Sequence, residues 1–274
     1  MAAHAQQTTV ASWYFGRVTP GQPVAPGAVF SGSGVSLHAA GNTTLVGTNL
    51  DAAHPYSVNF PGWLDVNADG TVDRTASMLS SDPGFVASAI GGSEAPGVTT
   101  LDPESAPFLV SAWIRPENAA LYPLGARQPG EISPNIVQKG RSNEVGGFWK
   151  VSLGLNRSSA GQLRWFPFCT FKGGNADQVE PGLRNKPAEG KLRYYLADGD
   201  IVRVECVKQG GTGTLNVYKP GIGAPVFTTS ETAAGVANFH IQNDAALSVG
   251  HKPRTTDPAD VYSGTLDNLV IKKH

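Results

Sequence analysis

The last third of the chain constrains its fold more than any other segment. Short runs rich in β-branched and aromatic residues alternate with glycine-containing breaks, as in Gly199–Lys208, Gln209–Gly213, Thr214–Gly221 and Tyr262–Lys273. Valine, isoleucine, threonine and tyrosine favour extended backbone, whereas glycine pairs favour the tight turns that join antiparallel strands. This segment therefore predicts a series of antiparallel strands joined by short loops.

The composition extends this prediction to the whole chain. The 33 glycines and 20 prolines among 274 residues disfavour long helices, and the 40% of hydrophobic residues can fill a sizeable core. The formal net charge is −1 and the basic residues are scattered, which argues against a nucleic-acid partner. The sequence holds no apolar run of the length that spans a bilayer, so we also expect no membrane span.

Extended runs separated by turn residues continue along the whole sequence, so we expect one domain covering residues 1–274. The irregular stretch 67–107 is predicted to be an inserted loop, because so long a connection without periodicity is usually an excursion from the framework. Residues 191–196 fit either a strand or a short helix. The other expected strands lie at 9–15, 28–30, 34–38, 56–60, 63–66, 108–116, 135–140, 147–155, 162–171, 199–208, 214–221, 246–250 and 262–273.

Several of these runs carry motifs of a known family. Phe108–Pro116 resembles the Phe-x-Val-x-x-Trp-Ile-Arg-Pro strand of laminin-G-like, concanavalin-A-like jelly rolls, and Ile136–Gly140, Leu247–Gly250 and Tyr262–Ile271 resemble later strands in the same order. The resemblance covers residues 108–273 well and the first hundred loosely. Gly199–Val207 departs from it, because Asp200, Ile201 and Val202 stand where the family has Trp-His-His. The resemblance implies an all-β, antiparallel, two-sheet jelly-roll sandwich, and it does not specify function.

In such a sandwich the large apolar side chains of these motifs fill the space between two sheets about 10 Å apart. We therefore expect Trp113, Phe148, Trp165, Tyr218 and Leu266 in the core.

The two cysteines lie in strand-like runs and leave two interpretations open. Cys169 and Cys206 can form a disulfide if their strands lie side by side, or they can remain two buried free thiols. Metal binding by two cysteines without a nearby histidine is not expected.

One local pattern points to a metal site. In Asp65–Asp73, oxygen-bearing side chains stand at positions 1, 3, 5 and 9 and glycine at position 6, as in the calcium loop of EF-hand or dockerin type. Ala76 occupies position 12, where that loop needs a carboxylate, so a plain solvated turn is the alternative. If calcium binds, its expected ligands are Asp65, Asn67, Asp69, Asp73 and the backbone carbonyl of Thr71.

Glycan binding needs aromatic rings that stack on sugars, and Tyr122, Trp149, Tyr194, Tyr195 and Tyr262 are the candidates. Catalysis is not expected. Glycosidases need two facing carboxylates, and the Glu-x-Asp-x-x-Glu motif of laminarinase-type relatives is missing. The arginine strand, Gln-x-His and Tyr-x-Lys-x-Gly-x-Tyr patterns of alginate-lyase relatives are also missing.

Together these features favour a non-enzymatic binding or structural protein. Met1–Gln7 has neither the charged nor the apolar region of a signal peptide, although Ala3, His4 and Ala5 fit a cleavage pattern. The family resemblance extends to laminin-G-like accessory proteins of bacteriophage capsids or tails. We therefore expect a virion-surface or extracellular protein that binds coat or tail subunits, as a homo-oligomer or within an assembly, and cell-surface polysaccharide. The alternatives are a secreted, calcium-dependent lectin-like module and a polysaccharide lyase or hydrolase.

Overall fold

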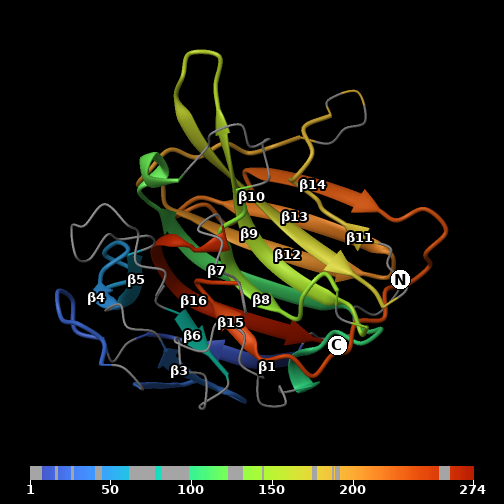
Figure 1. Ribbon diagram of the computed structural model, residues 1–274, viewed down its shortest axis with the longest axis horizontal. Coiled ribbons are helices and arrows are strands. Elements are labelled where there is room, and N and C mark those ends of the chain that lie inside the picture. The colour runs from blue at the N-terminus through green and yellow to red at the C-terminus, as the bar shows by residue number, and fades with distance from the viewer. Residues whose placement is uncertain are drawn as a thin grey trace.

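The computed structural model shows two antiparallel β-sheets packed face to face as a sandwich (Figure 1). It describes residues 8–15, 18–25, 28–40, 45–61, 78–81, 99–122, 132–143, 145–174, 178–186, 188, 192–252 and 260–274. The all-β, two-sheet jelly-roll class predicted from the sequence is confirmed. No helix among these residues is long and apolar enough to cross a membrane.

Sheet A contains the strands predicted at 199–208, 214–221 and 262–273, whereas the strand predicted at 246–250 lies in sheet B. Its order is β14-β13-β12-β7-β16-β5-β4, and β1 also pairs with β16. The eight strands are β1 (Thr8–Trp13), β4 (Val46–Thr48), β5 (Ser57–Pro61), β7 (Phe108–Pro116), β12 (Val202–Gln209), β13 (Thr212–Tyr218), β14 (Phe227–Thr232) and β16 (Ser263–Lys273).

Sheet B lies against sheet A in the order β11-β10-β9-β8-β15-β6-β3-β2. Its β9–β10 hairpin projects beyond the rest of the sheet, at the top of Figure 1. The strands are β2 (Val29–Ser31), β3 (Ser36–Ala40), β6 (Met78–Ser80), β8 (Asn135–Lys139), β9 (Phe148–Arg157), β10 (Leu163–Lys172), β11 (Gln178–Val179) and β15 (Leu247–Val249). Two short 3-10 turns, η1 (Thr99–Leu101) and η2 (Ala119–Leu121), complete the described elements.

The core follows the period-two alternation of the strands. In β12, Val202, Val204 and Cys206 point inward, and the residues between them are partly exposed. Trp165 and Leu266 belong to this core as expected, and Phe148 is also buried.

The core prediction is wrong for Trp113 and Tyr218. Both side chains are partly exposed on the outer face of sheet A, where Arg203 stands opposite each of them in the two neighbouring pairings. Successive side chains of a strand point to opposite faces of the sheet. Ala112 and Ile114 occupy inward positions of β7, so Trp113 between them must face outward.

Part of the stretch 67–107 belongs to the framework rather than to a loop. β6 pairs with β15 on one side and with β3 on the other, so it is an interior strand of sheet B. Leu101 and Asp102 are fully buried. A strand of three residues between neighbours needs little periodicity of its own, which is why the sequence pattern does not reveal it.

A buried ion pair anchors the end of this stretch. Lys139 Nζ lies 2.9 Å from each carboxylate oxygen of Asp102, and both side chains are fully buried. The same amino group donates to the Asn243 carbonyl at 2.8 Å, and the Asn243 side chain donates to the Gly147 carbonyl at 3.0 Å. The pair therefore joins sheet B to two segments far away in the sequence.

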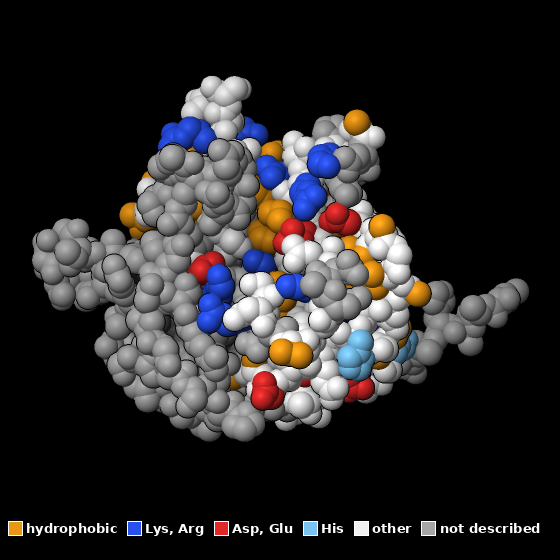
Figure 2. Space-filling model, turned by 45° about the vertical axis from the view of Figure 1, so that its right-hand side comes forward, with side chains coloured by type: hydrophobic (Ala, Val, Ile, Leu, Met, Phe, Trp, Pro, Cys, Tyr) orange, Lys and Arg blue, Asp and Glu red, His pale blue; other side chains and the backbone are white. Residues whose placement is uncertain are grey.

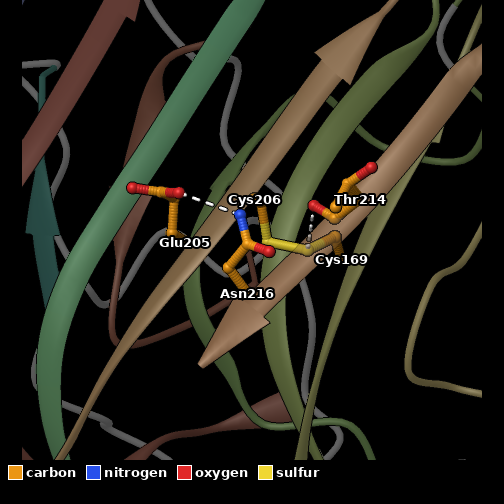
Figure 3. The surroundings of a disulfide bond; sticks show 5 residues. All are labelled: Cys169, Glu205, Cys206, Thr214 and Asn216. Atoms are coloured by element: carbon orange, nitrogen blue, oxygen red, sulfur yellow. Dashed lines mark hydrogen bonds between the residues drawn. A yellow bond between two sulfur atoms is a disulfide. The ribbon is translucent and has the colours of Figure 1, made fainter. Parts of the chain in front are cut away.

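A disulfide connects the two sheets. Cys169 lies in β10 of sheet B and Cys206 in β12 of sheet A, with their Cα atoms 5.8 Å apart across the core (Figure 3). The structure therefore selects the bridge over two free thiols, and it corrects the expected geometry: the two strands face each other from opposite sheets, so they are not neighbours. On the other face of β12, Glu205 accepts a hydrogen bond from Asn216 at 3.0 Å.

A second buried lysine, Lys208, contacts no carboxylate among the residues that the structure describes. Lys208 Nζ donates to the Ala106 carbonyl at 3.1 Å and to Asn238 Oδ1 at 3.2 Å, and burial lowers its pKa to about 8. The folded chain binds this proton less tightly than the unfolded chain does. Burial of Lys208 therefore lowers the free energy of unfolding below pH 8. That penalty disappears as the pH rises from about 8 toward the ordinary lysine pKa.

We expect Lys208→Met to stabilise the protein by about 1 to 2 kcal/mol at pH 7, because it removes an uncompensated buried charge. The advantage over the wild type should shrink between pH 8 and pH 10, where the wild-type lysine loses its proton on folding. Urea unfolding of both proteins across this pH range measures the difference. A variant that is less stable than the wild type at pH 7 would mean that the two hydrogen bonds outweigh the burial of charge.

Candidate binding face of sheet B

The structure places three of the five candidate glycan-binding aromatics inside the protein. Trp149 is fully buried and packs against Phe108 with ring centroids 5.1 Å apart. Tyr262 is also fully buried, and its hydroxyl donates to the Thr265 carbonyl at 2.9 Å. Tyr122 is buried against Trp165. Their assignment as sugar-stacking residues is corrected, since their rings are core residues that no ligand can reach.

The other two candidates are partly exposed but face different surroundings. Tyr194 packs on the core edge against Phe227 of β14, with centroids 5.6 Å apart. Tyr195 lies over sheet B, 6.2 Å from Phe166, and its hydroxyl accepts a hydrogen bond from Asn156 at 3.4 Å. Only Tyr195 is therefore placed on the outer side of sheet B.

The predicted calcium ligands Asp65, Asn67, Asp69, Thr71 and Asp73 lie outside the described residues. Within the described part of the chain, no group of three His, Cys, Asp or Glu side chains is arranged to hold a metal ion.

Two aromatic side chains lie on the outer side of sheet B, and both rings are fully covered by other side chains. In β10, Trp165, Cys169 and Phe171 point into the core, so Phe166 and Phe168 point outward, with their ring centroids 6.3 Å apart. Gly154 stands opposite Phe166 in β9, and a Cβ there would lie 2.1 Å from the ring. Glycine at this position therefore lets the Phe166 ring lie flat across the neighbouring strand.

Two cations lie over these rings. The Arg193 guanidinium stands 4.1 Å from the centroid of Phe166, and Lys150 Nζ stands 5.0 Å from that of Phe168. Arg193 also donates through Nε to the Leu183 carbonyl at 2.8 Å. Cation–π contacts and hydrogen bonds hold both side chains in place, so little conformational entropy remains to be lost on binding a ligand.

A carboxyl group stands on the same surface. Thr170 of β10 donates to Glu180 Oε1 at 3.4 Å, and the Glu180 backbone N–H donates to Glu231 at 2.8 Å. Burial raises the pKa of Glu180, although Lys150 and Arg184 act in the opposite direction. We call the outer side of sheet B around Lys150, Phe166, Phe168, Thr170, Glu180 and Arg193 the sheet-B face. Its two phenylalanines and Thr170 are buried, and its three charged side chains are partly exposed.

The segments around the sheet-B face add further charges. Lys252 forms an ion pair with Asp260, with a distance of 3.0 Å between the amino group and the carboxylate. The neighbouring His251 adds no charge at pH 7, because burial lowers the pKa of its imidazole to about 4. Arg157 and Arg164 are exposed beside the turn of the β9–β10 hairpin. Figure 2 shows basic side chains (blue) flanking an apolar recess (orange) on this side of the molecule, with acidic side chains (red) beside it.

Sequence reasoning missed Lys150, Glu180 and Arg193 as site residues. Lys150 had a usable signal, because it is the only charged residue in Phe148–Leu155. Glu180 and Arg193 had none, since both lie in irregular segments that reach sheet B only in the folded chain.

No protein-family model matches this sequence, and no curated protein matches it significantly. Three solved structures share its fold at low identity. The binding domain of Paraclostridial Mosquitocidal Protein 1 is 13% identical with a TM-score of 0.52, over 97% of this chain and 49% of that one.

The enzymatically active domain of tailspike protein 2 from bacteriophage CBA120 is 12% identical with a TM-score of 0.50, over 85% of this chain and 28% of that one. Full-length tailspike protein 2 from an Escherichia coli O157:H7 bacteriophage is 11% identical with a TM-score of 0.50, over 93% of this chain and 26% of that one. This chain thus spans less than half the length of each of these three structures. At these identities the likeness establishes a shared β-sandwich fold.

Proposed function

We propose that this chain is a non-enzymatic binding protein of a bacteriophage virion surface, and that its sheet-B face engages cell-surface polysaccharide. The observation that carries the proposal is the pair of cations, Lys150 and Arg193, held over the rings of Phe168 and Phe166. Lys150 and Arg193 are partly exposed and the buried rings beneath them hold them in place, so they suit ligands that present acidic groups. The fold is shared with the binding domain of Paraclostridial Mosquitocidal Protein 1 and with the enzymatically active domain of a phage tailspike, so it supports a phage or binding role without deciding between binding and catalysis.

The arrangement of carboxylates supports binding rather than hydrolysis. A glycosidase needs two carboxyl groups that act on one bond. Asp260 is engaged by Lys252 at 3.0 Å, and the carboxyl that remains on the described sheet-B face is Glu180. The neighbouring Glu231 carboxylate is also engaged, because it accepts a hydrogen bond from the Glu180 backbone N–H at 2.8 Å.

Two measurements test the proposal. Purified particles of the phage that encodes the chain should contain it in a fixed copy number, as quantitative mass spectrometry can establish. The isolated protein should bind a subset of glycans on an array, with and without EDTA. Loss of binding in EDTA would favour the calcium-dependent lectin-like alternative, and release of shortened sugars would favour the lyase or hydrolase alternative. Absence from the particles together with no glycan binding would overturn the proposal.

A further inference from the structure

Lys150 is the most unusual group on the sheet-B face. It lies near the start of β9, its side chain is half-buried, and its amino group donates to Ser133 Oγ at 3.0 Å. An ammonium group has three donors. Among the described residues that serine is the one hydrogen-bond partner of Lys150, so two donors remain for a ligand.

The charges that face Lys150 do not neutralise it fully. Glu180 and Asp260 lie near enough to favour its positive charge, and Lys252 disfavours it. Neither carboxylate forms an ion pair with Lys150 in the described part of the chain, and Asp260 is already paired with Lys252. Burial is the largest influence and lowers the pKa of Lys150 to about 8. The amino group is thus a desolvated cation without a direct counter-ion.

Arg193 is a second cation that lies over strand β10. Arg193 covers Phe166, Lys150 covers Phe168, and the two rings are adjacent on β10. A polymer lying along β10 would meet both cations in succession.

We infer that the sheet-B face recognises a carboxylated polysaccharide. Lys150 binds the carboxylate of one sugar residue, and Arg193 binds the next acidic sugar along the polysaccharide. This inference rests on the proposed function and names the class of its ligand. A carboxylate suits the site better than a phosphate dianion, because Glu180 and Asp260 repel a second negative charge beside Lys150. Glu180 is left to accept hydrogen bonds from sugar hydroxyls.

The test compares acidic polysaccharides with their carboxyl-reduced forms, which differ only in that group. Polygalacturonate, alginate and hyaluronate, each beside its reduced form and with dextran sulfate as a polyanion control, are titrated against the wild type, Lys150→Met, Arg193→Met and Lys219→Met. Lys219 lies in the exposed turn after β13 and is the matched control. We expect at least one acidic form to bind and its reduced form to fail. Lys150→Met should weaken that binding about tenfold to hundredfold, and Lys219→Met should leave it unchanged. Thermal unfolding confirms that each variant is folded.

The pH dependence separates a direct contact from a structural effect. Once the pH exceeds the pKa of Lys150 in the free protein, about 8, wild-type affinity should fall about tenfold per pH unit until the pH reaches the higher pKa of the complex. A Lys150→Arg variant remains charged and should show no such fall. Equal binding of acidic and reduced forms by all four proteins would refute the carboxylate inference but keep polysaccharide binding. Binding to no sugar would refute both, and equal binding to dextran sulfate would show general attraction of polyanions instead of carboxylate recognition.

Discussion

Replacing Lys139 with methionine is expected to lower the free energy of unfolding by about 3 to 5 kcal/mol, because it leaves the Asp102 carboxylate buried without its counter-ion. Both side chains are fully buried, and the amino group contacts both carboxylate oxygens and the Asn243 carbonyl. Chemical denaturation at pH 7 measures the loss.

Two further variants show whether the pairing itself is responsible. Lys139→Met with Asp102→Asn removes both charges, so it should recover much of the lost stability, and the double-mutant cycle measures the coupling. Lys273→Met removes a partly exposed pair with Glu104, 2.8 Å apart, and should cost less than about 1 kcal/mol. If Lys139→Met cost no more than Lys273→Met, the buried pair would not anchor the fold.

Removing the disulfide with Cys169→Ala and Cys206→Ala is expected to cost about 4 kcal/mol, since the bridge joins two residues that are 37 positions apart in the sequence. The unfolded chain gains conformational freedom when this link between the sheets is lost. Both cysteines are fully buried in the core, so the lost packing adds to the effect.

The wild type in dithiothreitol provides an independent measurement. Its denaturation midpoint should fall toward that of the double alanine variant, and the variant should not respond to the reductant. Equal midpoints for the oxidised wild type, the reduced wild type and the variant would show that the bridge contributes nothing to stability.

The strands that carry clear alternation were predictable, and the positions that depend on neighbours were not. Val202, Val204 and Cys206 alternate with partly exposed residues just as a half-buried strand requires. Trp113 looks like a core residue because of its size, yet its parity places it outside, and only the strand register decides that. β6 is too short for periodicity and exists because β3 and β15 both pair with it.

The candidate site shows the same division. The sequence shows which aromatic residues could contact a sugar, but it does not show which of their side chains are exposed. Three of the five candidates proved to be core residues. The side chains that define the sheet-B face come from β9, β10 and the segments around residues 180 and 193.

By itself the sequence determined the all-β class, the antiparallel strands of the last third and the candidate cysteine pair, because propensity, period-two alternation and glycine turns act over a few neighbouring residues. Only the tertiary structure decided that Cys169 and Cys206 join opposite sheets, that Trp149 is buried, and that Lys150 and Arg193 lie over adjacent rings. Those outcomes depend on register and on which loop covers which strand. Both are set by contacts between residues far apart in the chain, which local pattern does not encode.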